Sequence, residues 1–152
     1  MPILHPDALA DLAARIFLAA GASEPNARTV AQSLVLSDLA GHESHGVVRV
    51  RQYLNSIAAG DILPAAEPVV ARETAVMASV DARRGFGQVA ARLAMDCAVE
   101  KARAQGLAAA GIFHCNHVGR LGEWVEQAAA AGMVALAFCS LGRRGAAVAP
   151  YG

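Results

Sequence analysis

Leu107-Ala108-Ala109-Ala110-Gly111-Ile112-Phe113 is a short, continuous apolar run, and the polar sequence His114-Cys115-Asn116-His117 follows it directly. A run of this kind that leads into a helix, here over residues 121–131, is typical of a buried strand in an α/β sheet. The alternation of strands and helices predicts an α/β fold with a sheet buried on both faces. The other strands are predicted at residues 69–72, 76–80 and 133–138, and the long helix that opens with two glycines over residues 88–105.

The chain before the first strand is predicted to be helical. Apolar residues recur at helical spacing over residues 6–20 and again over residues 23–38. A third helix is predicted after Gly46 and is expected to end at Gly60, so that the motif at residues 41–46 lies at its N-terminus. We therefore expect two parts, a helical segment over residues 1–65 that carries this motif and an α/β part over residues 66–152.

The composition limits the classes of function. Thirteen Lys and Arg residues balance thirteen Asp and Glu residues, and no basic stretch is interleaved with aromatic residues, so we expect no nucleic-acid partner. No apolar run approaches the roughly 18 to 20 residues that cross a membrane, and the first residues lack the basic and apolar regions of a secretory signal. The widely spaced Cys97, Cys115 and Cys139 indicate free thiols. We expect a soluble, cytoplasmic protein with no membrane partner.

The first candidate site is the motif Gly41-His42-Glu43-Ser44-His45-Gly46, which Arg49 follows. Arginine matches a carboxylate through two hydrogen bonds, histidine exchanges a proton near neutral pH, and Ser44 can orient the imidazole. If a helix begins near His45, Arg49 and Tyr53 project from the same side. The motif predicts a site for a small hydroxy or keto acid. In the alternative interpretation, Ser44 is only a helix N-cap and His45 an ordinary first-turn residue.

The second candidate site follows the strand at Leu107–Phe113. His114 and His117 lie between this strand and a helix, where α/β sheets commonly bind ligands. Gly119 and Gly122 allow close backbone approach, and the N–H groups there favour an anion such as a cofactor phosphate. Arg120 adds positive charge. The alternative is an ordinary strand-to-helix turn that contains an incidental histidine.

Two rival sites are less well supported by the sequence. Gly85-Phe86-Gly87-Gln88-Val89-Ala90 matches the G-x-G-x-x-A pattern of dinucleotide-binding folds. The next strand ends at Phe113-His114 instead of the acidic residue that this pattern expects, so a packing turn is favoured. Two H-x-x-H pairs could form a metal site, but no carboxylate lies near the second pair, and we expect no metal. The pairs are His42 with His45 and His114 with His117.

Taken together, the sequence resembles the malate/L-lactate dehydrogenase family of the second type. This family includes sulfolactate and ureidoglycolate dehydrogenases and a cyclic-imine carboxylate reductase. The resemblance covers nearly the whole chain and rests on many anchors in a fixed order. They are Asp38–Gly46, Arg49, Tyr53, Gly60, Val80-Asp81, Gly85–Gln88, Asn116–Arg120, Gly132-Met133 and Val148–Gly152.

The resemblance implies hydride transfer between a nicotinamide cofactor, NAD or NADP, and a small 2-hydroxy or 2-imino acid. It also implies a homodimer and a cofactor fold like that of sulfolactate dehydrogenase, which is not the ordinary Rossmann unit. By position, Ser44 and His45 belong to the proton relay, and Arg49 contacts the substrate carboxylate beside His45. His117 matches a site histidine that is the proton acceptor in some members. The implied cofactor contacts are His117, Gly119, Arg120, Leu121 and Gly122.

Members of this family are about twice as long as this chain. We therefore interpret the 152 residues as a truncated, N-terminal portion that is inactive alone. Three alternative functions stay open. The chain could belong to a cyclic-imine carboxylate reductase of the same family, act as a non-catalytic fragment, or bind a metal through its histidines.

Overall fold

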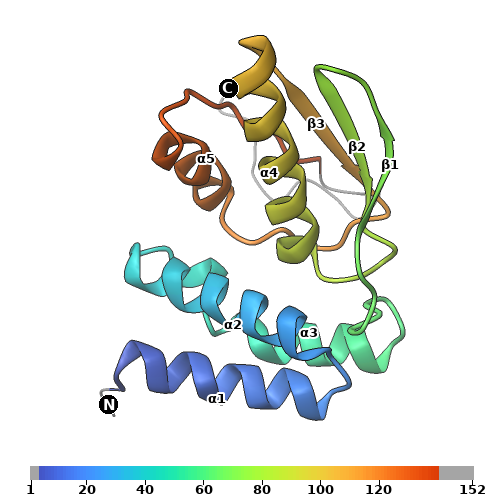
Figure 1. Cartoon of the computed structure of the whole chain (residues 1–152). Helices are drawn as coiled ribbons and strands as arrows, with labels where there is room; N and C mark the ends of the chain where they lie inside the picture. The colour runs from blue at the N-terminus through green and yellow to red at the C-terminus, as the bar shows by residue number, and fades with distance from the viewer. Residues whose placement is uncertain (1–3, 141–152) are drawn as a thin grey trace, which may run out of the picture.

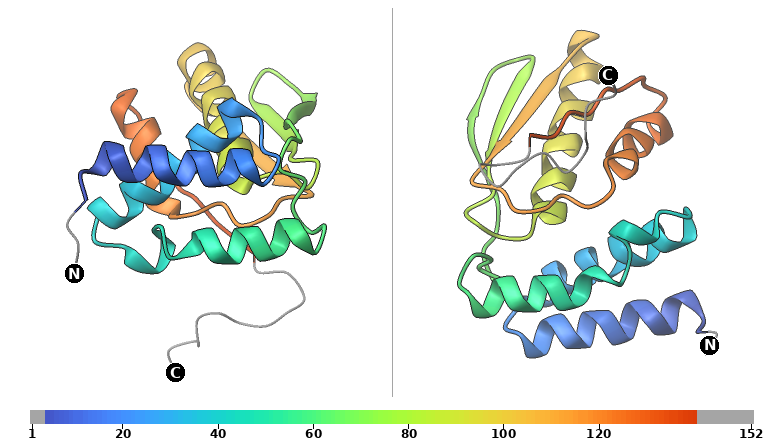
Figure 2. Two further views of the ribbon diagram at one scale, coloured as in Figure 1. Left: turned by 90° about the horizontal axis from the view of Figure 1, so that it is seen from below. Right: turned by 180° about the vertical axis from the view of Figure 1, so that it is seen from behind.

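The computed structural model describes residues 4–140, in which helices precede a small mixed sheet. Helices α1, α2 and α3 lie together at one end of the molecule, and α4 and α5 lie beside the strands at the other (Figures 1 and 2). The predicted α/β class, with N-terminal helices followed by a mixed sheet layer, is confirmed. The elements are α1 (Pro6–Ala19), α2 (Glu24–Leu39), a 3-10 turn η1 (Glu43–His45), α3 (Arg49–Ala58), β1 (Val69–Glu73), β2 (Met77–Asp81), α4 (Gly87–Gln105), β3 (Ala109–Phe113) and α5 (Leu121–Ala130).

The three strands have the order β1-β2-β3. β1 and β2 form the predicted antiparallel hairpin, in which Val70 pairs with Val80 and a bulge follows Val70. β3 runs parallel to β2, with Ile112 opposite Val80. The connection between these two parallel strands is α4, which packs on β2 and β3. The carboxyl end of β3 therefore delivers the second motif to the start of α4.

Local sequence signals explain where two of the helices begin and end. Ser23 is the N-cap of α2, and its Oγ accepts a hydrogen bond from the backbone N–H of Asn26 at 3.4 Å. α4 ends at Gly106, which has a φ of +84° and closes the last turn by donating to the carbonyl of Ala102. Only glycine adopts this left-handed conformation without strain, so the helix stops at this residue.

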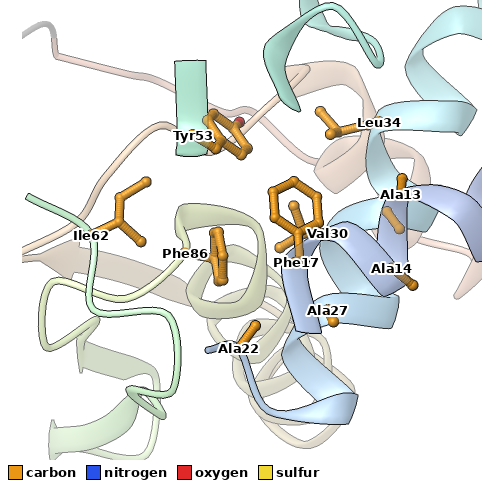
Figure 3. Packing of buried hydrophobic residues seen from close by; sticks show 11 residues of the cluster. Ala13, Ala14, Phe17, Ala22, Ala27, Val30, Leu34, Tyr53, Ile62 and Phe86 are labelled. Carbon is orange, nitrogen blue, oxygen red and sulfur yellow. The ribbon is translucent and has the colours of Figure 1, made fainter. Parts of the chain in front are cut away.

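The main core joins the helical end of the molecule to α4. Phe17 of α1 packs edge-on against Phe86, the residue before α4, with ring centroids 5.5 Å apart. Tyr53 of α3 completes this aromatic group, and Figure 3 shows the three rings surrounded by aliphatic side chains. Burial of such large apolar side chains stabilises the packing by about 1.5 to 3 kcal/mol for each. The core therefore holds Tyr53 against the start of α4.

The third helix follows Gly46, as predicted, but its first residue is Arg49, and His45 lies in the short turn η1. Two other predictions about the elements are wrong. Residues 133–138 form no strand in the described part of the chain, since β3 pairs only with β2 and no ladder hydrogen bonds reach Met133–Phe138. The sheet is also not buried on both faces, because α4 covers one face and most residues of β1 and β3 stay exposed.

Val134, Leu136 and Phe138 are 98%, 81% and 88% exposed. An apolar run forms a strand only when a neighbouring strand satisfies its backbone groups, and residues 4–140 place no such neighbour beside it. The anchor Val148–Gly152 lies outside the described residues. Within those residues, no helix combines the length and apolarity needed to cross a bilayer.

Candidate active site

Tyr53, Gln88 and His117 form a line of hydrogen bonds at the junction of the two ends of the molecule. Tyr53 comes from α3, Gln88 from the first turn of α4, and His117 from the loop between β3 and α5. The Tyr53 hydroxyl lies 2.7 Å from the Nδ1 of His117 and 2.7 Å from the Nε2 of Gln88. Gln88 and Tyr53 are buried, whereas His117 is half-buried and reaches the surface. The line thus runs from the core to a surface imidazole.

The first motif lies beside this imidazole. The ring centroids of His45 and His117 are 5.1 Å apart, and those of His42 and His45 are 4.6 Å apart. The Oγ of Ser44 lies 2.9 Å from the Nδ1 of His45, as the orienting role predicts. The structure therefore brings Ser44 and His45 of one motif together with His117 of the other.

Arg49 belongs to the same group of side chains. Its Nε donates to the carbonyl of Ser44 at 2.5 Å, and its Nη1 donates to the Oε1 of Gln52 at 2.5 Å. Within residues 4–140, its Nη2 has no protein partner. The guanidinium is therefore anchored to the first motif and keeps one nitrogen available for an anion.

The two site histidines are held in the neutral form. Burial, followed by the positive charge of Arg49 and by repulsion between the imidazoles of His117 and His45 when both are protonated, lowers the pKa of His117 from 6.5 to about 4. Burial, followed by His42 and Arg49, also lowers the pKa of His45. A neutral imidazole has one nitrogen with a free lone pair, so both rings are available as bases at neutral pH.

The conformation of the first motif depends on Asp38 at the end of α2. The Oδ2 of Asp38 accepts a hydrogen bond from the backbone N–H of Val47 at 2.9 Å. The carboxylate lies so close to Gly46 that a Cβ at that position would overlap it. The glycine after Ser44-His45 is therefore required by close packing, because its φ of −85° is open to any residue. Val47 and Val48 follow as a turn, and α3 begins at Arg49.

The second motif is fixed by Asn116. Its Nδ2 donates to the carbonyls of Asp61, Arg84 and Gly85, at 3.2, 2.9 and 3.0 Å. The carbonyl groups of Asn116 and His117 press against Gly87, where a Cβ would overlap both. The Gly85–Ala90 pattern is therefore a packing turn, as favoured from the sequence, and the start of α4 is closed by protein backbone.

The turn before α5 contains the other predicted cofactor residues. Gly119 is buried with a φ of +78°, and no side chain among residues 4–140 caps the helix that begins at Leu121. Arg120 donates two hydrogen bonds of 2.7 Å to Glu126, while its Nε is buried and has no partner among these residues. The guanidinium also lies against Gly122, where a Cβ would overlap it.

A buried carboxyl group lies behind this turn. Glu123 accepts a hydrogen bond of 2.6 Å from the hydroxyl of Ser33, and burial raises the pKa of Glu123. Its second oxygen, Oε1, has no donor in the described part of the chain. No pattern in the sequence predicts this contact, because Ser33 and Glu123 are 90 residues apart.

The four histidines do not converge. His114 has a φ of +48° and turns toward Asp81, whose carboxylate lies 3.1 Å from its Nδ1. The cluster of two H-x-x-H pairs is therefore not formed. Among residues 4–140, no three His, Cys, Asp or Glu side chains are arranged to hold a metal ion.

The sequence matches one protein family over almost its full length. The sequence model described as malate/L-lactate dehydrogenase matches residues 4–152. Hydroxycarboxylate dehydrogenase B of Escherichia coli K12 is 38% identical over 83% of this chain and 35% of its own length. The ureidoglycolate dehydrogenase (NAD(+)) of the same strain is 36% identical over 79% of this chain and 34% of its own length. A Δ1-pyrroline-2-carboxylate/Δ1-piperideine-2-carboxylate reductase of Pseudomonas aeruginosa is 37% identical over 86% of this chain and 39% of its own length.

Solved structures give the same result for the fold. Malate dehydrogenase from Entamoeba histolytica aligns with a TM-score of 0.82 and 32% identity, over 86% of this chain and 37% of its own. Sulfolactate dehydrogenase from Methanocaldococcus jannaschii aligns with a TM-score of 0.79 and 31% identity, over 83% of this chain and 37% of its own. The predicted likeness to sulfolactate dehydrogenase is confirmed. The chain spans little more than a third of the length of these proteins.

Proposed function

The chain belongs to the malate/L-lactate dehydrogenase family, and from this premise we propose that it forms part of an NAD(P)-dependent 2-hydroxyacid dehydrogenase. The observation that carries the proposal is the meeting of two neutral imidazoles, those of His45 and His117, beside the guanidinium of Arg49. Oxidation of a 2-hydroxy acid needs a base for the hydroxyl proton and a cation for the carboxylate. These residues supply both.

Arg49 is proposed to bind the substrate carboxylate. Its hydrogen bonds to the Ser44 carbonyl and to Gln52 fix the guanidinium, and Nη2 is the nitrogen that remains for the acid. An anchored carboxylate orients the neighbouring hydroxyl toward the imidazoles, with His45 as the second substrate contact. Such positioning lowers the barrier by avoiding the entropy loss of an unguided encounter.

Ser44, His45 and His117 are proposed as the group that moves the proton. Ser44 holds the ring of His45, and Tyr53 holds the ring of His117. Proton transfer to a positioned base accelerates such reactions by about 10²- to 10⁴-fold. The low pKa of His117, about 4, keeps it unprotonated and ready to accept a proton throughout the neutral range.

The cofactor is proposed to lie against His117 and the turn formed by Gly119, Arg120, Leu121 and Gly122. The uncapped start of α5 and the unpartnered Nε of Arg120 fit an anionic group such as a cofactor phosphate. A nicotinamide held by these residues would supply the hydride acceptor of the reaction. NAD or NADP fills this role, and residues 66–152 are proposed as the first part of the cofactor-binding domain.

A second reaction is favoured by one relative. The Pseudomonas aeruginosa reductase of cyclic imine carboxylates is as similar to this chain as the hydroxyacid dehydrogenases are. A 2-imino acid carries the same carboxylate for Arg49 and differs in the nitrogen at C2. Reduction of Δ1-piperideine-2-carboxylate is therefore the alternative activity of the same site.

The surroundings of the site support two further proposals. We propose a homodimer, because large apolar side chains such as those of Leu136 and Phe138 are exposed. We also propose a cytoplasmic location, because Cys97, Cys115 and Cys139 are free thiols.

The function is tested on the natural-length protein by mixing NAD⁺ or NADP⁺ with malate, lactate, sulfolactate or ureidoglycolate and measuring reduced nicotinamide by absorbance. Reduction of Δ1-piperideine-2-carboxylate with NADH or NADPH is measured in parallel. We expect turnover of at least one substrate, at least 100-fold slower in His117→Asn. His114→Asn is the matched control, because His114 lies in the same loop but faces Asp81. No turnover with any substrate and either cofactor contradicts the proposal and leaves a non-catalytic role.

A further inference from the structure

The Tyr53 hydroxyl is shared by the hydrogen bonds to Gln88 and to His117, so the position of the hydrogen in one bond determines its position in the other. The two bonds of the line are short, and the exposed fractions of Gln88 and Tyr53 are 0% and 2%. Burial raises the pKa of Tyr53 to about 12, so the phenol keeps its single hydrogen at all physiological pH values. Tyr53 therefore donates to one neighbour and accepts from the other.

Two arrangements of hydrogens are compatible with this line. In the first, the amide nitrogen of Gln88 donates to Tyr53, and Tyr53 donates to the Nδ1 of His117. The hydrogen of the neutral imidazole is then on Nε2, which cannot accept a proton. In the second, the amide is turned by 180°, and its oxygen accepts the hydrogen of Tyr53. The Nδ1–H of His117 then donates to the phenol oxygen, and Nε2 keeps a free lone pair.

The surroundings of the Gln88 amide favour the second arrangement. With the amide nitrogen on Tyr53, the amide oxygen is buried and has no donor in the described part of the chain, and the same holds for the Oε1 of Glu123. A Cβ at Gly119 would lie 3.3 Å from the Oγ of Ser33 and 3.5 Å from the amide nitrogen of Gln88. The Gln88 side chain and the Ser33 hydroxyl, which donates to Glu123, therefore both lie beside Gly119.

Among residues 4–140, the Oε1 atoms of Gln88 and Glu123 are thus both buried acceptors without a donor. A buried acceptor that lacks a donor costs about 1 to 3 kcal/mol. Turning the amide replaces its unpaired oxygen with an N–H₂ group, which the negative charge of Glu123 attracts. The same turn supplies an acceptor for the hydrogen of Tyr53.

We propose that Gln88 is a positioning residue which, through Tyr53, holds His117 as the Nδ1–H tautomer and so makes Nε2 the proton-accepting atom of the site. The proposal rests on the dehydrogenase function above and names the atom that performs its proton step. The O–H bond of the substrate breaks and its proton forms the new N–H bond at Nε2. The C2 hydrogen leaves with its electron pair to the nicotinamide, and a 2-keto acid remains. The Nδ1–H of the resulting imidazolium keeps its hydrogen bond to Tyr53.

The tautomer is measured directly by NMR of the chain labelled with ¹⁵N-histidine, without any need for activity. The ring signals of His117 are identified by their absence in His117→Gln. At neutral pH we expect a protonated Nδ1 and an unprotonated Nε2, which have clearly separated ¹⁵N shifts. A protonated Nε2 in the wild-type chain overturns the proposal, even if every variant fails to fold.

Two variants test the role of Gln88. Gln88→Met removes the amide from a residue that has no contact with His117 and keeps the length of the side chain. We expect it to shift His117 toward a mixture of tautomers, as Tyr53→Phe does. If Gln88→Met folds, with Trp124 fluorescence like wild type, and leaves the tautomer unchanged, Gln88 does not position His117.

In the natural-length protein, Gln88→Met is expected to lower kcat about tenfold with little change in the KM of the hydroxy acid, because it acts on proton transfer and not on binding. An unchanged kcat contradicts the proposal. Absence of all activity in the wild-type protein refutes the dehydrogenase function instead, and the NMR result still decides the tautomer.

Discussion

Gly46→Ala tests whether the carboxylate of Asp38 fixes the first motif. A Cβ at Gly46 would overlap the side-chain atoms of Asp38, so the carboxylate must move. Its movement breaks the hydrogen bond of 2.9 Å from the backbone N–H of Val47. The backbone itself accepts alanine, since the φ of Gly46 is −85°. Any loss of stability therefore comes from the contact with Asp38.

The magnitude follows from two opposing effects. A hydrogen bond to a charged group contributes about 1.5 to 3 kcal/mol to stability. Replacing glycine by alanine restricts the unfolded chain and returns about 0.4 to 1 kcal/mol. We therefore expect Gly46→Ala to lower the free energy of unfolding by about 1 to 2 kcal/mol.

The assay is urea unfolding of the chain, followed by the fluorescence of Trp124, which is the only tryptophan and is buried. Gly111→Ala is the matched control, because a Cβ at Gly111 meets nothing within 4 Å. In an Asp38→Ala background, where the overlap is gone, Gly46→Ala should cost nothing. Equal stabilities of Gly46→Ala and Gly111→Ala, or the same loss in both backgrounds, would refute the reasoning.

Three further changes have defined outcomes. The pKa of His117 is 6.5 in the unfolded chain and about 4 in the folded chain, so its contribution to the free energy of unfolding is present above pH 6.5 and is lost as the pH falls toward 4. Urea titrations should therefore show a smaller loss of stability between pH 6.5 and pH 4 for His117→Gln than for the wild-type chain. Burial raises the pKa of Glu123 above 4.5, so its contribution to the free energy of unfolding is lost as the pH rises. Glu123→Gln should therefore stabilise the chain at neutral pH, whereas Glu126→Gln, the control at an exposed carboxylate, should not. Equal effects of the two substitutions would contradict this. Asn116→Asp turns a carboxylate toward three carbonyl oxygens, so its thermal midpoint should fall below that of Asn116→Ala, and the reverse order would be contrary to the observed contacts.

The elements that the sequence predicted well depend on local signals. The Ser23 cap, the glycine at the end of α4 and the apolar run of β3 each lie within a few residues of the structure they determine. The two motifs were also found in the sequence, since each gathers its functional groups within nine residues. Local signals could not show the contact between the Asp38 carboxylate and the backbone at Gly46 and Val47, because these groups meet only when α2 and η1 pack together.

The hydrogen-bond line of the site depends on contacts between distant parts of the chain. Gln88 is 35 residues from Tyr53, and Tyr53 is 64 residues from His117. The sequence marked Gln88 only as part of a glycine-rich packing turn. One signal for the burial of Gln88 was available in the sequence. Gln88 directly follows Gly87, and backbone carbonyl groups pack against Gly87 at the start of α4. Residues 133–138 failed as a strand for a related reason, since pairing depends on a neighbour that the run itself does not specify.

The most direct test of the proposed function is the transfer of deuterium. The natural-length protein is incubated with NAD⁺ or NADP⁺ and with 2-hydroxy acids that carry deuterium at C2, and the reduced cofactor is analysed by mass spectrometry. We expect deuterium in the nicotinamide ring with at least one acid, and its loss in His117→Asn but not in His114→Asn. Deuterium released to water, or a cofactor that stays oxidised with every acid, would contradict a hydride-transfer function for this site.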